Sequence, residues 1–176
     1  MSFHGGLCGF ILASYLIAKK YKLSTLKILD VSAIIAPLCL FFGRLMNFVN
    51  GELYGRATDG SWGVVFTSDE LTLLRHPSQL YEAFLEGLVT FGIMLYASKN
   101  IKNAKSGFFA ALFVLLYGTF RFIVEFFREP DEQVGYIFEY FTLGQMLCVF
   151  MILIGSCMMA SSHDPKTLRK HDLSVK

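Results

Sequence analysis

Cysteine, tryptophan and charged residues are scarce in this sequence, and their scarcity excludes several classes of protein. The four cysteines each lie inside an apolar run, without paired spacing and without neighbouring histidines. That placement argues against a zinc site and against a disulfide framework, and it predicts that they are small core residues. Because these cysteines do not form a ligand cluster, we expect no metal site. The opening MSFHGG also lacks the basic region of a cleavable signal peptide.

Apolar residues are abundant instead. They make up 54% of the 176 residues, whereas charged residues make up 17%, and the mean hydropathy is +0.50. Ordinary soluble domains are more polar, so the composition predicts an integral membrane protein. Apolar segments run over residues 7–18, 28–48, 80–97, 107–127 and 141–160. We predict an all-α, polytopic membrane bundle of five transmembrane helices over residues 1–161, followed by a basic cytoplasmic tail, 162–176.

The lysines indicate how the bundle is oriented. They are confined to the connection 19–27, the connection 98–106 and the C-terminal tail. These three regions follow alternate segments, so they belong on one side of the membrane, which the positive-inside rule identifies as the cytoplasm. The N-terminus is then predicted to be periplasmic and the C-terminus cytoplasmic.

The other side of the membrane carries arginines and no lysine: Arg44, Arg56, Arg75, Arg121 and Arg128. A guanidinium group binds phosphate or carboxylate with two parallel hydrogen bonds, which favours an anion site on the outer side. The alternative is that these arginines pair with the acids of the same half. Those acids are Glu52, Glu82, Glu125, Glu129 and Asp131. The sequence leaves both interpretations open.

A charged stripe continues the fourth apolar segment in YGTFRFIVEFFREPD. Tyr117, Arg121, Glu125 and Arg128 are spaced by four, four and three residues, which places them on one helix face. Charges next to a membrane span usually mark a functional interior. The simpler alternative is an Arg121–Glu125 ion pair that only orients helices.

The second apolar segment ends in GRLMNFVNGELYGR. Arg44 and Asn47 share a helix face, and the turn at Asn50 is followed by Glu52. Such polar groups at a membrane need partners, and a polar ligand headgroup is one way to supply them. For Asn50, a water-exposed helix end is the alternative.

Two further helix starts contain polar side chains. In RHPSQLYE, Ser78 and Gln79 offer side-chain hydrogen bonds near the outer helix end, and His76 is either a cap or a polar contact. In TLGQML, Thr142 followed by Gln145 fits a capping box. We interpret both features as mainly structural.

His4 precedes two glycines at the outer start of the first segment. A helix N-terminus disfavours the imidazolium form, so this histidine should be neutral near neutral pH and able to accept a proton. The alternative is a polar filler at the membrane interface.

Taken together, HGG, GRLMNFVNGELYGR, RHPSQLYEA, YGTFRFIVEFFREPD and GQML resemble the prolipoprotein diacylglyceryl transferases, in the family's order and over nearly the whole chain to about residue 151. The resemblance implies transfer of the diacylglyceryl group of phosphatidylglycerol to the lipobox cysteine of a prolipoprotein, in the bacterial inner membrane with the site towards the periplasm. It implies no cofactor and no nucleic acid partner. The catalytic residues implied are His4, Arg44 and Arg121, and the substrate-binding residues are Asn47, Asn50, Glu52, Gly55, Tyr117, Glu125 and His76.

The resemblance departs most at the front of the chain, because family members carry two more membrane segments before the HGG motif. The sequence therefore looks like a truncated or split form, for which a separate polypeptide would supply the missing helices. An inactive fragment and a lipid- or anion-binding transporter are the alternatives to the transferase.

Overall fold

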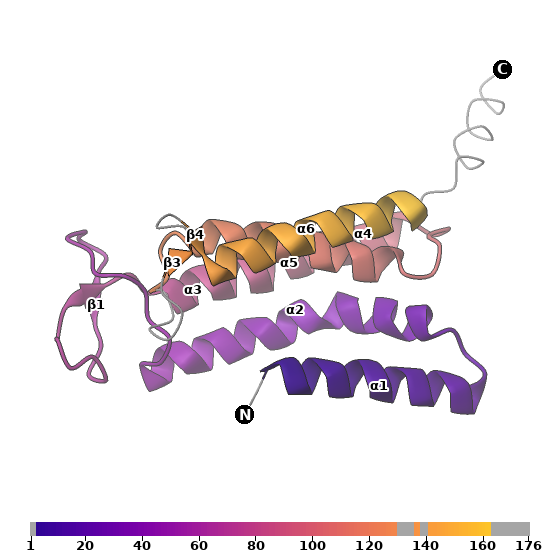
Figure 1. Ribbon diagram of the computed structural model, residues 1–176, viewed down its shortest axis with the longest axis horizontal. Helices are drawn as coiled ribbons and strands as arrows, with labels where there is room; N and C mark the ends of the chain where they lie inside the picture. The colour runs from indigo at the N-terminus through magenta and orange to yellow at the C-terminus, as the bar shows by residue number, and fades with distance from the viewer. Residues whose placement is uncertain (1–2, 130–135, 138–140, 163–176) are drawn as a thin grey trace, which may run out of the picture.

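The computed structural model describes residues 3–129, 136–137 and 141–162, with the side chain of His4 outside the described part. Nearly all of the predicted C-terminal tail also lies outside the described residues. The helices are α1 (Phe3–Tyr21), α2 (Thr25–Asn50), α3 (Ser78–Glu82), the π-helix η1 (Ala83–Val89), α4 (Thr90–Asn100), α5 (Phe108–Val124) and α6 (Leu143–Ser162). Since α3, η1 and α4 run on without a break, five long helices form a bundle of roughly aligned rods (Figure 1).

The helices match the five predicted apolar segments. Within the described residues, Thr25–Asn50, Ser78–Asn100 and Leu143–Ser161 are long and apolar enough to cross a membrane, and Phe108–Val124 is a shorter apolar helix. The mainly helical fold is thus confirmed, whereas five spans and their orientation stay predictions. Two short antiparallel hairpins were not predicted: β1 (Val64–Val65) with β2 (Leu74–Arg75), and β3 (Tyr136–Ile137) with β4 (Phe141–Thr142).

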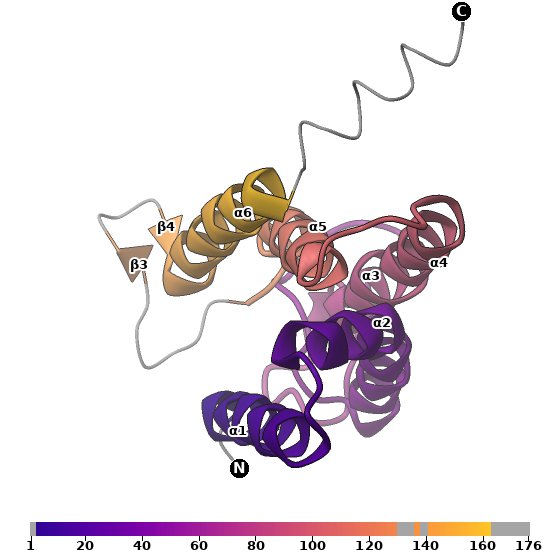
Figure 2. The same cartoon turned by 90° about the vertical axis from the view of Figure 1, so that its right-hand side faces the viewer.

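Helix α5 lies in the middle of the bundle, between α6 on one side and α2 with α4 on the other (Figure 2). Two glycines let α5 and α6 approach closely. A Cβ atom on Gly155 would lie 2.8 Å from the backbone nitrogen of Leu115, and one on Gly118 would lie 3.1 Å from Cβ of Met151. Small residues of this kind allow close packing between membrane helices. Helix α1 packs mainly on α2, at the edge of the bundle.

The cysteines correct one prediction. Cys148 is buried, but Cys8, Cys39 and Cys157 are exposed on the bundle surface, so they are not core residues. In a membrane helix an apolar side chain can face lipid as well as the core, and the apolar runs that contain these cysteines do not distinguish the two surroundings.

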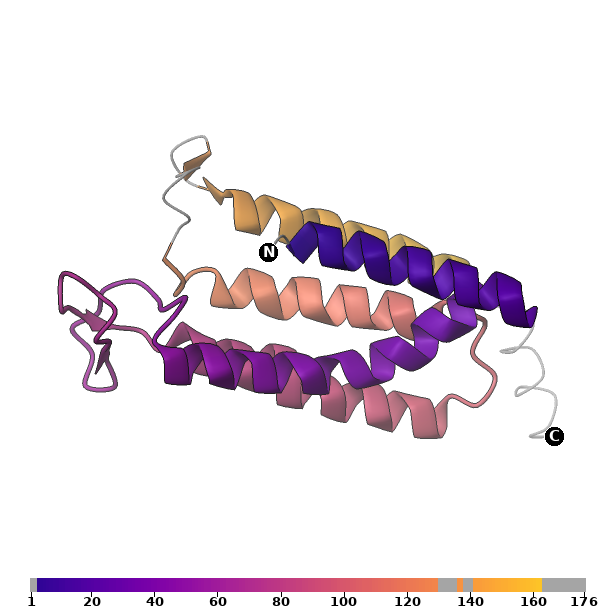
Figure 3. The ribbon, with the colours of Figure 1, turned by 90° about the horizontal axis from the view of Figure 1, so that it is seen from below.

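Two residues of α2, the helix that carries Arg44, have distinct structural roles. Pro37 lies inside α2, where it cannot donate a backbone hydrogen bond, and α2 is bent along its length (Figure 3). Nearer the start of α2, the buried carboxylate of Asp30 accepts hydrogen bonds from the backbone nitrogens of Gly107, at 2.7 Å, and Ala110, at 2.9 Å. Asp30 therefore caps the first turn of α5 from a neighbouring helix.

The connections fall at two ends of the bundle. The lysine-bearing connections, α1 to α2 and α4 to α5, lie at one end. The long connection from α2 to α3, with its β1–β2 hairpin, lies at the other end, together with the last turn of α5 and the start of α6 (Figure 1). The outer arginines of the sequence therefore collect at this second end.

Candidate functional site

Arg44 and Arg121, both predicted to be catalytic, meet at one carboxylate. Arg44 from α2 places Nε 2.9 Å from Oε2 of Glu82, and Arg121 from α5 places Nη1 2.5 Å from Oε1 of the same side chain. Arg128, just after α5, adds Nη1 at 3.2 Å from that oxygen. Glu82, at the end of α3, is fully buried, so three helical segments converge on one charged group.

Glu86 lies one turn further along the same helix, inside η1. Its oxygens are 3.7 Å from Nη2 of Arg44 and 3.6 Å from Nη1 of Arg121, and the side chain is fully buried. No hydrogen bond reaches either oxygen among the described residues. Single π-helical turns occur often at functional sites, and here η1 presents this second carboxyl group to the same two arginines.

The predicted stripe is confirmed only in part: Tyr117 and Arg121 lie on α5 and the expected ion pair forms, but α5 ends at Val124, so Arg128 lies beyond the helix. Arg121 Nη2 lies 3.1 Å from Oε2 of Glu125, four residues later. Tyr117, one turn earlier, packs its ring on Phe113 with centroids 5.9 Å apart, and it interacts electrostatically with Glu86. Arg121 therefore has carboxylate partners on its own helix and on the neighbouring one.

The start of α6 holds Glu125 in place. Thr142 Oγ1 donates a hydrogen bond of 3.0 Å to Oε1 of Glu125 and accepts one of 3.1 Å from the backbone nitrogen of Gln145. The Gln145 side chain in turn accepts from the Thr142 nitrogen at 3.2 Å, which confirms the predicted capping box. A Cβ atom on Gly144 would lie 2.7 Å from Cδ of Glu125, so a larger residue there would require the Glu125 carboxylate to shift.

The predicted headgroup ligands of the second motif occupy different surroundings. Asn47 is half-buried and Asn50 is exposed at the end of α2, which Gly51 terminates in the left-handed conformation at φ +68°. The Glu52 side chain is exposed, whereas its carbonyl oxygen accepts a hydrogen bond of 2.7 Å from Gln79 Nε2. The structure thus brings Arg44 into the buried charge cluster, whereas the side chains of Asn50 and Glu52 are exposed.

Gly55 marks a crossing of three chain segments. Its nitrogen donates to the carbonyl of His76 at 2.9 Å, and the next nitrogen, that of Arg56, donates to the carbonyl of Phe127 at 2.9 Å. A Cβ atom on Gly55 would lie 2.8 Å from the His76 carbonyl oxygen. The requirement for glycine at this position is therefore explained by backbone packing.

The RHPSQLYE motif joins the outer loop to α3, and Ser78 and Gln79 make the side-chain hydrogen bonds expected of them. Ser78 Oγ donates to the Leu53 carbonyl at 3.2 Å, and both Ser78 and Gln79 are fully buried. His76 makes the expected polar contact, with Nδ1 3.3 Å from the hydroxyl of Tyr81, and its ring packs edge-on against Phe127. These contacts fix the helix start that carries Glu82.

The two remaining outer arginines are bound within the loop region. Arg75 binds Asp69 through Nε at 2.7 Å and Nη2 at 3.1 Å, and it reaches Glu129 through Nη1 at 3.1 Å. The hydrogen bond from Arg75 lowers the pKa of the Asp69 carboxyl to about 2. Arg56 Nε donates to the Arg128 carbonyl at 2.8 Å. For Arg75 the pairing interpretation is therefore confirmed.

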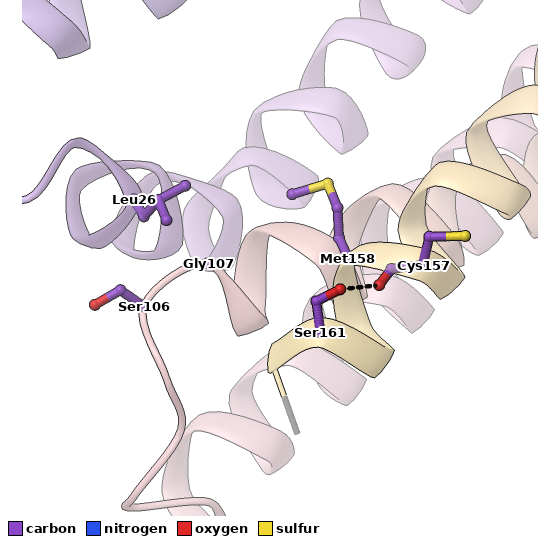
Figure 4. A pocket seen from close by; sticks show the side chains of 6 residues that line it. All are labelled: Leu26, Ser106, Gly107, Cys157, Met158 and Ser161. Carbon is purple, nitrogen blue, oxygen red and sulfur yellow. Dashed lines mark hydrogen bonds between the residues drawn. The ribbon is translucent and has the colours of Figure 1, made fainter. Parts of the chain in front are cut away.

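A separate apolar pocket opens at the opposite, lysine-bearing end. It has a volume of about 310 Å³ and is lined by residues from the start of α2, the start of α5 and the end of α6 (Figure 4). The lining residues are Leu26, Ser106, Gly107, Cys157, Met158 and Ser161. Ser161 Oγ donates a hydrogen bond of 2.9 Å to the carbonyl of Cys157, so this hydroxyl group is turned towards its own helix (Figure 4).

Sequence reasoning missed the roles of Glu82 and Glu86. In the sequence, Glu82 is one of several acids in the outer half, and Glu86 lies outside the motifs described above. A signal was present, because both acids lie within the apolar segment 80–97 and are four residues apart, on one helix face. Acids inside a membrane segment are costly and mark functional interiors by default.

Apolar helices long enough to cross a membrane, with buried arginines and glutamates gathered at one end of the bundle, define an integral membrane protein with a polar site. Comparison with known proteins agrees: the prolipoprotein diacylglyceryl transferase family matches residues 1–161. The chain belongs to this family.

Relatives from two species show the extent of the match. A phosphatidylglycerol--prolipoprotein diacylglyceryl transferase of Rickettsia rickettsii (strain Sheila Smith) is 49% identical over 164 residues, covering 93% of this chain and 63% of the relative. One of Rickettsia bellii (strain OSU 85-389) is 52% identical over 156 residues, covering 88% of this chain and 59% of the relative. The chain therefore spans about three-fifths of the length of these relatives.

Proposed function

We propose that this chain transfers the diacylglyceryl group of phosphatidylglycerol to the cysteine thiol of a prolipoprotein lipobox, forming a thioether and releasing glycerol phosphate. The names of the relatives and the family match support this reaction. The reaction takes place at the periplasmic side of the bacterial inner membrane, on the arginine-bearing end of the bundle.

The observation that carries the proposal is the convergence of Arg44 and Arg121. Their guanidinium groups come from different helices and reach the same buried carboxylate, so they are close enough to share one anionic ligand. Cleavage of the carbon–oxygen bond leaves a phosphate monoester, and negative charge grows on its oxygens in the transition state. Preorganised donors at that position typically contribute about 10²- to 10³-fold in rate each.

The remaining roles follow from the chemistry of the reaction. A thiol attacks as the thiolate, so a base is needed near the sulfur, and His4 is our candidate. Glu125 holds Arg121 in position, and Asn47 with Asn50 binds the headgroup. The other substrate-binding candidates are Glu52, Gly55, Tyr117 and His76.

The test is transfer by the purified protein. Folded protein is incubated with phosphatidylglycerol and a lipobox peptide, and the mass of the peptide is measured. Arg44→Ala and Arg121→Ala should each abolish the mass shift while the protein still inserts and accumulates. Lys102→Ala removes an exposed cation at the opposite end and should leave transfer unchanged.

Co-expression distinguishes a chain that is active alone from one part of a split enzyme. Transfer that appears only when a polypeptide carrying the relatives' additional segments is co-expressed would identify this chain as one part of a split enzyme. No transfer in either case, or full transfer by both arginine variants, would contradict the proposed chemistry.

A further inference from the structure

Among the described residues, the charges of the cluster balance without a ligand. It contains three guanidinium groups and three carboxyl groups: Arg44, Arg121, Arg128, Glu82, Glu86 and Glu125. If all six are ionised, the positive and negative charges balance. A phosphate group that enters the cluster adds at least one negative charge at a site where the carboxylates are almost completely withdrawn from water. An uncompensated charge at such a site is strongly disfavoured.

The three carboxyl groups are not equally well bound. Glu82 accepts hydrogen bonds from Arg121 and Arg128 and lies against Arg44. Glu125 accepts from the hydroxyl of Thr142 and pairs with Arg121. Hydrogen bonds of this kind stabilise the ionised form.

Glu86 has none of these bonds. Its two contacts with guanidinium nitrogens are 3.6 and 3.7 Å long, beyond hydrogen-bond distance, and both oxygens are buried without a hydrogen-bond partner in the described chain. Of the three, it is the carboxylate whose protonation disrupts the fewest interactions.

We propose that Glu86 takes up one proton from solvent when the phosphate of an anionic lipid binds between Arg44 and Arg121. This inference rests on the proposed function, because it takes the same two arginines as the phosphate-binding groups. The added proton restores neutrality and frees both guanidinium groups from their contact with Glu86. The side chains of Arg44, Arg121 and Arg128 are 16%, 14% and 12% exposed, so the cluster is not sealed from its surroundings.

Charged and titratable groups surround Glu86 from each packed element. Arg44 faces it from α2, Glu82 from α3, Tyr117 and Arg121 from α5, and Arg128 from the segment after α5. Arginines keep their protons in proteins, and Glu82 has the hydrogen bonds described above, so the proton is assigned to Glu86.

The proton is measured by isothermal titration calorimetry of the detergent-solubilised full chain. Short-chain phosphatidylglycerol is titrated at one pH in two buffers of different ionisation enthalpy, and the difference in heat gives the number of protons taken up. We expect about one proton per bound lipid near pH 8 and none with short-chain phosphatidylcholine, because its headgroup has no net charge. A parallel titration with glycerol phosphate shows whether a free phosphate produces the same uptake as the lipid headgroup.

Variants locate the proton. Glu86→Gln keeps the shape of the side chain and removes the carboxylate, so it should bind phosphatidylglycerol without proton uptake. Its affinity should also be independent of pH, whereas the affinity of the wild-type chain should fall by up to about tenfold per pH unit at alkaline pH, as linkage of one proton requires. Glu70→Gln, which neutralises an exposed loop acid, should behave as the wild type does.

Each outcome decides a different point. Phosphatidylglycerol binding without proton uptake by the wild-type chain would overturn the inference and leave the proposed function standing, and this measurement does not depend on any variant folding. Uptake that persists in Glu86→Gln would overturn the assignment to Glu86. No binding of phosphatidylglycerol at any pH would overturn both the inference and the proposed function.

Discussion

Gly87→Ala should loosen the contact that holds Arg44 against the two buried glutamates. Gly87 lies in η1, directly after Glu86, and packs on the backbone of α2 at Phe41. A Cβ atom at position 87 would lie 2.7 Å from Cβ of Phe41 and 2.8 Å from its Cα. Ordinary contact begins at 3.4 Å, so the shortest of these contacts must lengthen by about 0.7 Å, which pushes the two helices apart at this point.

The magnitude follows from two opposing effects. Alanine is the better helix former, by about 1 kcal/mol over glycine, whereas overpacking a close helix contact costs about 1–3 kcal/mol. Gly92 offers a matched control on the same continuous helix, because nothing lies within 4 Å of its would-be Cβ. The propensity gain is common to both variants, so Gly87→Ala should be less stable than Gly92→Ala by about 1–3 kcal/mol.

Activity should respond as well. Phe41 precedes Arg44 by three residues, so separation of the helices moves the Arg44 guanidinium relative to Glu82 and Glu86. A displacement approaching 1 Å at a catalytic group can cost about 10²-fold in rate. We expect a loss of roughly tenfold or more in the transfer assay for Gly87→Ala and no loss for Gly92→Ala.

Unfolding in mixed detergent micelles, followed by far-UV circular dichroism, measures the free energies of the two variants against the wild type. Lipobox-peptide transfer is measured on the same preparations. Equal stability and equal activity of the two variants would show that the Gly87 contact does not set the position of α2, and the reasoning would fail.

Three further predictions concern groups around the site. Asp69 has a folded-state pKa of about 2, below its ordinary value of 3.8, so its bond to Arg75 should stabilise the outer loop above pH 4 and be lost as the pH falls from 4 towards 2. Limited proteolysis of the loop across this pH range measures the loss. The Asp69→Asn variant should show no such pH dependence. Asp30→Ala should destabilise the chain by about 1–2 kcal/mol, measured by detergent unfolding, because the first turn of α5 loses its capping carboxylate. Thr142→Val should reduce transfer, because Glu125 loses a hydrogen bond of 3.0 Å and with it part of its hold on Arg121.

Contrary results would be equally clear for these three. Loop proteolysis that does not change between pH 4 and 2 would contradict the Asp69 assignment. Unfolding of Asp30→Ala at the wild-type denaturant concentration would show that backbone groups of α5 find water instead. Wild-type transfer by Thr142→Val would show that Glu125 is held by Arg121 alone.

The sequence predicted the features that depend on near neighbours. Apolar segments long enough for helices can be read from a continuous stretch of chain. The Arg121–Glu125 pair and the Thr142–Gln145 capping box each join residues that are at most four positions apart. Their geometry follows from the helix itself, so spacing alone was sufficient.

The partners of Arg44 could not be predicted in this way. The arginines of the outer half had several acids available, and the sequence does not order them. Packing of α2 against η1, which the close approach at Gly87 permits, selects Glu82 and Glu86 for Arg44. In the same way, Arg75 is withdrawn from the site by Asp69, a partner in its own loop.

Composition and spacing by themselves determined a helical membrane protein with five of its six arginines in the half opposite the lysines, because hydropathy and helix periodicity are properties of short stretches of chain. Tertiary structure alone decided which charges meet. Asp30 caps a helix 77 residues away, and Arg121 reaches Glu82 across 39 residues. Contacts over such distances depend on which helix faces pack together, and many pairings satisfy the same local pattern until side-chain volumes and close backbone approaches select one.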